Sequence, residues 1–233
     1  MFKYLVLDLE TSIKNRGEEA VGKFPASPFH PDNNVVLAGY RSDNALYTIT
    51  KDRNVSGPGI KELELLVGHN IGFDLLYLLR EKEWQEWVKT GHIWDTMLVE
   101  YLLSGQAKTF PTLDYCSEKY GGTLKDDKIK EYWKEGVDTE DIPVEELRHY
   151  LIGDVENTEK VFLAQLEAVE EAGMLELVHS QMEARLATIM MEWNGMHFDK
   201  KIAHHQSKAL EYTRAALTDV AASTMTVMCP QVH

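Results

Sequence analysis

The chain has 233 residues, of which 44% are hydrophobic and 27% charged, and its formal net charge is -14. A chain of this length buries a core without staples, and its two cysteines, Cys116 and Cys229, form neither a disulfide framework nor a zinc-binding spacing. The acidic net charge argues against a protein that holds duplex phosphates by charge alone. The acidic residues Asp8 and Glu10 near the N-terminus argue against a signal peptide or a membrane span there. We therefore expect a cytoplasmic protein with no membrane partner.

The first half of the chain alternates strand-like and helix-like segments. A nearly continuous apolar run up to Asp8 predicts a buried strand, and a long polar loop follows it. A turn signal at residues 42–44 predicts a hairpin. Strands are expected at 2–10, 35–40, 45–50, 63–67 and 93–94. A single helix is expected from Phe73 to about Trp84.

The second half is mostly helical. Capping residues, glycines and apolar spacing set the expected helices, which run from Asp95 or Thr96 to Gly105, from 112 to 120, from Pro143 to Gly173, and over 175–193 and 200–222. Strands followed by alternating strands and helices predict an α/β fold with a mixed β-sheet flanked by helices. The expected domains are residues 1–173 and a C-terminal helical extension, 174–233.

Asp8 and Glu10 lie two residues apart at the end of the first expected strand. The period of a strand points both side chains to one face. Two like charges held together raise each other's energy unless a cation neutralises them. The alternative is that this segment simply ends the strand in a solvated turn, and the motif alone does not separate the two readings.

Two further segments carry acids in structured surroundings. Asn70 and Asp74 belong to a glycine-flanked turn that opens a helix, where Asp is also ordinary complementation of the helix dipole. Tyr150 and Asp154 lie four residues apart on the helix after Pro143 and share one face beside an apolar stripe. Each residue alone also fits a plain structural role, as a turn former, a half-buried aromatic or a surface acid.

In this order and approximate spacing, the three segments resemble the motifs of the DEDD superfamily of exonucleases, in its tyrosine-containing branch. The residues that carry the resemblance are 7–11, 70–74 and 150–154, with 94–98 similar to the intervening helix. The resemblance covers residues 2–172 and is greatest to the proofreading 3′-5′ exonuclease domain of phage-type family A DNA polymerases. It implies a ribonuclease H-like fold and no missing catalytic position.

The resemblance also implies a set of roles. Two divalent metal ions, Mg²⁺ or Mn²⁺, would be held by Asp8, Glu10, Asp74 and Asp154, and oxygen-only ligands favour these ions over zinc. Tyr150 would orient the attacking water. The positions that would line the cleft for the terminal nucleotides are Leu9, Thr11, Asn70 and Phe73. Phe73 fits base stacking and helix core equally well.

The segment from 183 to 199 resembles the stretch that leads from the exonuclease domain into the polymerase region of family A enzymes, and no polymerase motif follows it. The expected substrate is the 3′ end of single-stranded DNA, with a DNA polymerase subunit or a missing polymerase domain as partner. The expected localisation is the cytoplasm, that of the host if a phage encodes the chain.

Three alternatives stay open at this point. A ribonuclease D-like RNA exonuclease would use the same five residues, because sugar preference depends on contacts to the 2′-hydroxyl. A non-catalytic module could keep the fold for binding DNA or docking on a polymerase. A zinc enzyme built on the nine histidines is disfavoured, because His204 and His205 are adjacent and no His-Glu-x-x-His pattern occurs.

Overall fold

A computed structural model of the chain describes residues 4–17, 24–42, 47–50, 60, 63–123 and 128–228. It divides the chain into two compact units, Met1–Trp193 and Asn194–His233. The first unit holds all the strands and all but one of the helices found in the described ranges. In chain order the elements are β1 (Tyr4–Thr11), β2 (Val35–Ser42), β3 (Tyr47–Thr50), β4 (Leu65–Gly68), α1 (Ile71–Leu78), α2 (Lys82–Trp87), β5 (His92–Asp95), α3 (Thr96–Leu103), α4 (Leu113–Lys119), α5 (Lys128–Lys134), the short helix η2 (Thr139–Asp141), α6 (Val144–Glu171) and α7 (Leu175–Asn194).

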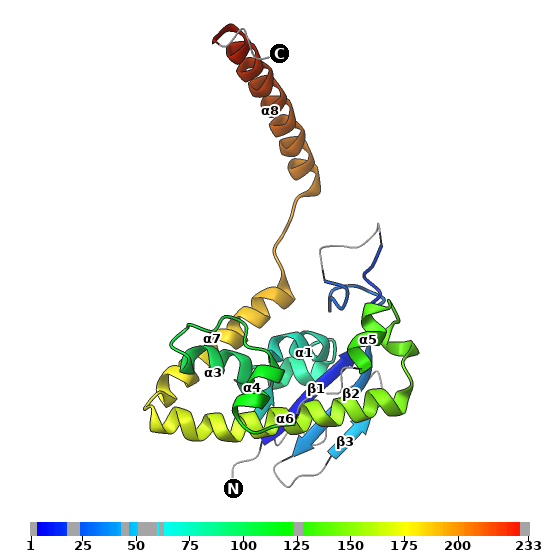
Figure 1. The fold of residues 1–233 in the computed structure, drawn as a ribbon, viewed down its shortest axis with the longest axis vertical. Helices are drawn as coiled ribbons and strands as arrows, with labels where there is room; N and C mark the ends of the chain where they lie inside the picture. The colour runs from blue at the N-terminus through cyan, green and yellow to red at the C-terminus, as the bar shows by residue number, and fades with distance from the viewer. Residues whose placement is uncertain are drawn as a thin grey trace. The chain divides into compact units, whose positions relative to one another are not determined.

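The strands form one mixed sheet in the order β3-β2-β1-β4-β5. β1 pairs antiparallel with β2 and parallel with β4, and β4 pairs parallel with β5. α6 runs across this sheet and contacts β1, β2 and β4 (Figure 1). Helices flank the sheet, so the fold is the expected mixed α/β fold of ribonuclease H-like type.

The core is one continuous cluster of apolar side chains between the sheet and the helices. Its largest fully buried members include Trp84, Tyr40 and Phe162, from α2, β2 and α6. A smaller cluster of Leu113, Cys116 and Val161 joins α4 to α6. Burial of these residues supplies the main free energy that holds α6 against the rest of the unit.

Most expected elements occur within a few residues of their predicted bounds, and one expectation is wrong. The single helix predicted over 73–84 is two helices, α1 and α2, separated by a turn in which Glu81 is extended at φ -100 and ψ 136. No glycine or proline marks this break. Trp84 and Trp87 are both buried and meet edge to face at 5.5 Å, so tertiary packing sets the second helix. The predicted hairpin turn falls largely outside the described residues.

The expected boundary at residue 173 falls at the turn between α6 and α7, where Gly173 has φ +66. α7 belongs to the first unit, because Val178, Met182 and Ile189 are buried in its core. The second unit begins at Asn194 and contains α8 (Lys200–Met228), whose N-terminus is capped by Asp199 through the amides of Lys201 and Ile202. Among the described residues, none of the helices combines the length and apolar character that crossing a bilayer requires.

Candidate active site

β1 presents the first pair of acids. Its central position in the sheet buries the strand, yet Asp8 and Glu10 both occur on it, Asp8 half-buried and Glu10 only 5% exposed. They are paired with Gly39 and Leu37 of β2, which share their face of the sheet. The strand thus holds two carboxylates side by side on one face, as the period-2 spacing predicted.

A glycine on β2 determines how closely α6 approaches this face. A Cβ built on Gly39 would lie 2.8 Å from Cγ of Leu151 and 3.1 Å from Cγ2 of Val155. The absence of a side chain at Gly39 therefore lets the apolar stripe of α6 lie directly on the sheet beside Asp8. Asp154 follows Leu151 by one helical turn and is carried to the same place.

Three carboxylates converge as a result. Ligand oxygens of Asp8, Glu10 and Asp154 all lie within 4.8 Å of one another. Three negative charges at this separation repel each other strongly in a partly buried site unless a cation or protons compensate them. The donor set is oxygen only, which is the set that Mg²⁺ and Mn²⁺ prefer. The residues present therefore fit a divalent metal site.

Asp74 lies beside this cluster and is attached to β1 itself. β4 pairs with β1 only as far as Val6 and Val67, and further along the strand the amide of Leu9 donates to Oδ1 of Asp74 at 3.1 Å. Burial raises the pKa of Asp74 well above its usual range, and the charge of Asp8 raises it further. Asp74 is thus a buried acid whose pKa depends on the charge of Asp8.

The turn before α1 fixes Asn70 in an unusual conformation. Asn70 is left-handed, with φ 57 and ψ 45, a region that Asn tolerates better than most residues. Its backbone amide donates to Oδ1 of Asp95 at 2.9 Å, and its backbone carbonyl accepts from the backbone amide of Phe73 at 3.0 Å. Hydrogen bonds therefore hold the turn at both ends, and the turn fixes the start of α1, the helix that carries Asp74.

Tyr150 lies one turn before Asp154 on α6. It is half-buried, and its ring meets Trp133 edge to face at 5.9 Å. Burial raises the pKa of Tyr150, and the charges of Asp154 and then Glu10 raise it further. Tyr150 and Asp154 together line a cavity of ≈ 610 Å³ beside α6. The phenol is therefore a protonated hydrogen-bond donor next to the carboxylates.

The remaining residues predicted to line the cleft differ in what they expose. The side chain of Leu9 is buried in the core, so its contribution near the site is the backbone amide that holds Asp74. Thr11 is also buried. Phe73 is half-buried, and its ring meets Phe24 at 6.0 Å and Tyr77 at 5.4 Å, which leaves part of an aromatic surface exposed.

The basic residues near the third motif are mostly paired with acids. Lys128 meets Glu146 at 2.9 Å, and Lys130 meets Asp114 at 2.8 Å. Lys125 lies outside the described residues. Such pairs are typical of a solvated protein surface, and they leave these lysines less suited to holding phosphate.

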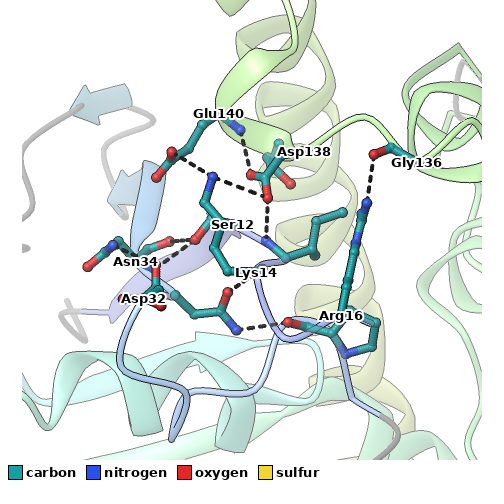
Figure 2. A network of polar contacts seen from close by, with 12 residues as sticks. Ser12, Lys14, Arg16, Asp32, Asn34, Gly136, Asp138 and Glu140 are labelled. Atoms are coloured by element: carbon teal, nitrogen blue, oxygen red, sulfur yellow. Dashed lines mark hydrogen bonds and ion pairs between the residues drawn. The ribbon is translucent and has the colours of Figure 1, made fainter. Parts of the chain in front are cut away.

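A polar network ties the loop after β1 to the segment that leads into α6 (Figure 2). The amide of Ile13 donates to Asp138 at 3.3 Å, and Nζ of Lys14 lies 3.1 Å from Glu140 and 3.5 Å from Asp138. Arg16 donates to the carbonyl of Gly136 at 2.6 Å. The exit of the strand that bears Asp8 and Glu10 is thereby fixed to the approach of the helix that bears Asp154.

Two contacts near the site have no counterpart in the local sequence pattern. Arg185 of α7 approaches the Asn70 turn across a separation of more than a hundred residues, and no local pattern indicates it. Asp95 reads as a helix cap, which it is, but it also accepts the amide of Asn70. Only a long-range contact reveals this second role.

No protein-family model matches the chain, and no curated protein matches it. Among solved structures, the chain is similar to the family B DNA polymerase from the hyperthermophilic archaeon Pyrobaculum calidifontis, at a TM-score of 0.47 and 19% identity. The match covers 71% of this chain and 25% of that polymerase, so the chain spans about a quarter of its length. The strand order and the helix placement described above define the fold. That polymerase belongs to family B, whereas the sequence motifs resemble those of family A.

Proposed function

We propose that this chain is a metal-dependent 3′-to-5′ exonuclease that hydrolyses nucleotides from single-stranded DNA ends. The observation that carries the proposal is the convergence of Asp8, Glu10 and Asp154 within 4.8 Å, from a strand and a helix far apart in sequence. A structural role does not account for three acids in a half-buried cluster, because burying like charges together costs free energy. A metal-assisted hydrolase uses such a cluster.

Asp8, Glu10 and Asp154 would hold the divalent ions, with Asp74 contributing from the α1 side. When bound, two such ions would supply a water activated for attack and charge compensation at the departing oxygen of the phosphodiester. The protein's own contribution is positioning. The Leu9 amide fixes Asp74 relative to β1, and the close packing at Gly39 fixes Asp154 relative to Asp8.

Tyr150 would orient the attacking water. Because its pKa is raised above the ordinary value, the phenol stays protonated at neutral pH and donates a hydrogen bond. It does not remove a proton in the reaction. Trp133, packed edge to face against the ring, restricts the directions in which the hydroxyl can point.

The biological setting that we propose is proofreading in DNA replication, in the cytoplasm, either by the chain alone or as part of a family A-type DNA polymerase. The support is the sequence resemblance of 183–199 to the stretch that leads into such a polymerase. The acidic net charge of -14 also fits an enzyme that receives its substrate from a partner.

Degradation of a 5′-labelled single-stranded DNA oligonucleotide with Mg²⁺ or Mn²⁺ tests the proposal, with matched RNA as competitor. We expect a ladder that shortens from the 3′ end. Asp8→Ala should lower the rate at least ~100-fold, because it removes charge stabilisation in the transition state. Tyr150→Phe should slow it roughly tenfold to a hundredfold through loss of positioning.

The control is Glu170→Gln, which changes an exposed acid of α6 that belongs neither to the converging cluster nor to the cavity beside it. Preferential degradation of the RNA competitor would favour the ribonuclease alternative. No cleavage by folded wild-type protein with either metal would contradict the exonuclease and favour a non-catalytic binding module.

A further inference from the structure

An arginine of α7 lies against the turn that carries the second motif. Nη2 of Arg185 lies 3.4 Å from Oδ1 of Asn70, and Nε lies 3.6 Å from Oδ2 of Asp95. A Cβ built on Gly72 would lie 2.2 Å from Nη2 and 2.7 Å from Cζ of Arg185. The guanidinium therefore lies directly on the backbone of the turn, in a space that exists only because residue 72 is glycine.

The partner of this arginine is a buried acid. The side chain of Asp95 is 1% exposed, and its Oδ1 accepts the amides of Asn70, Met97 and Leu98. Its Oδ2 makes no hydrogen bond to any described residue, so within that part of the chain Arg185 is the cation that compensates it. Asp95 and Arg185 together form a bridge from β5 and α3 to α7, with the Asn70 turn between them.

This bridge determines which way the side-chain amide of Asn70 points. Because Oδ1 of Asn70 faces the guanidinium, which can only donate, the amide group is not free to flip. Its nitrogen then faces away from Arg185 as a donor. Asn70 lies four residues before Asp74 and at the N-terminus of α1, the end of a helix that favours negative charge.

We propose that Arg185 is a positioning residue of the nuclease site, which holds the Asn70 side chain so that its amide nitrogen donates to an oxygen of the terminal nucleotide of the substrate. The inference rests on the proposed function and adds α7 to the site. It assigns Gly72 as the residue that makes room for the guanidinium.

Steady-state kinetics of single-stranded DNA cleavage by the full chain tests the proposal in Arg185→Ala, Arg185→Lys and Gly72→Ala. We expect Arg185→Ala to raise KM about tenfold with little change in kcat. This is the expected effect of losing one partly exposed hydrogen-bond network that includes charged groups. Arg185→Lys should have an intermediate KM, because lysine keeps the charge but lacks the fork. Gly72→Ala, which displaces the guanidinium, should resemble Arg185→Ala. Arg214→Ala, an exposed arginine of α8, is the control that should match wild type.

Hydrogen exchange at the amides of Asn70 and Phe73 supplies a readout that does not depend on cleavage. We expect faster exchange at both amides in Arg185→Ala than in wild type. An unchanged KM in folded Arg185→Ala would overturn the proposal, as would unchanged exchange at the turn. An equal fall of kcat in all three variants without a KM difference would also overturn it, since a merely structural role would produce that pattern. If wild type does not cleave but exchange at the turn rises in Arg185→Ala, the positioning holds and the proposed function fails.

Discussion

At the scale of single residues, the site concentrates carboxylates in a partly buried environment that does not stabilise their negative charge. Asp74 is buried, and the charge of Asp8 adds to the cost of burying it, so its pKa is raised. In the absence of a cation this arrangement opposes folding, because a carboxylate in the unfolded chain is solvated and far from its like-charged neighbours. The residues of the site therefore lower the stability of the metal-free protein.

Asp74→Asn should relieve this cost. Asparagine keeps the oxygen that accepts the Leu9 amide and removes the buried charge beside Asp8. We expect the metal-free variant to gain on the order of 1–2 kcal/mol in the free energy of unfolding, within the usual size of a single-residue effect. The stabilisation by millimolar Mg²⁺ or Mn²⁺ should shrink, since one ligand is lost. Urea unfolding with and without metal measures both.

The control for this prediction is Asp141→Asn, an exposed acid of η2 that is not in the cluster. It removes the same net charge from an acidic protein without touching the site. A gain of the same size in Asp141→Asn would mean that net charge alone explains the effect. A metal-free Asp74→Asn protein less stable than wild type would contradict the electrostatic account.

At this scale the sequence was informative where the spacing is local. Two residues apart on a strand and four apart on a helix define a face, which was enough to align Asp8 with Glu10 and Tyr150 with Asp154. The contact between Arg185 and Asn70 joins residues with no such relation. A single sequence contains no pattern that pairs them.

At the scale of elements, the placement of α6 on the sheet depends on one missing side chain. Gly39→Ala adds a methyl group 2.8 Å from Cγ of Leu151, which is fully buried against the sheet. We expect a loss of about 1–3 kcal/mol in the free energy of unfolding from this overpacking. We also expect slower DNA cleavage, because Asp154 moves with α6.

Gly153→Ala is the matched control for stability, since it makes the same substitution within α6. A Cβ there meets nothing within 4 Å, and alanine favours a helix over glycine. We expect a gain of roughly 0.5–1 kcal/mol in the free energy of unfolding. A gain in Gly39→Ala, or equal effects in the two variants measured by urea unfolding, would contradict the role assigned to close packing at Gly39.

The sequence was enough to predict which segments form helices and strands, but it was less informative about where one helix ends and the next begins. Caps at Asp95 and Thr112 and the start at Pro143 are local chemistry, and the structure places helices after each of them. The break between α1 and α2 has no local signal, because it is set by where Trp84 must pack. Gly39 reads as an ordinary strand residue until α6 is seen above it.

At the scale of the whole molecule, the division of the chain lies after α7. The sequence places a boundary at Gly173 because a glycine follows a long helix. The structure continues the first unit through Trp193, since the apolar face of α7 packs into the same core. A turn signal marks the end of a helix, but it does not say which core the next helix joins.

Truncated chains test this division. A chain of residues 1–193 should fold, because it keeps the core intact. A chain of residues 1–173 loses the buried Val178, Met182 and Ile189 and should be less stable by roughly 5 kcal/mol or more. Urea unfolding monitored by circular dichroism compares the two. Equal stability of the two chains, or failure of 1–193 to fold, would contradict the division.

The central claim is that these carboxylates bind divalent metal ions and receive a 3′ end. Anomalous diffraction from crystals of the Tyr150→Phe chain, grown with Mn²⁺ and a single-stranded DNA oligonucleotide, tests it most directly. We expect manganese peaks in contact with Asp8, Glu10 and Asp154, and the 3′-terminal nucleotide beside them and near Asn70. The absence of manganese from the carboxylates, or a 5′ end in that place, would contradict the account.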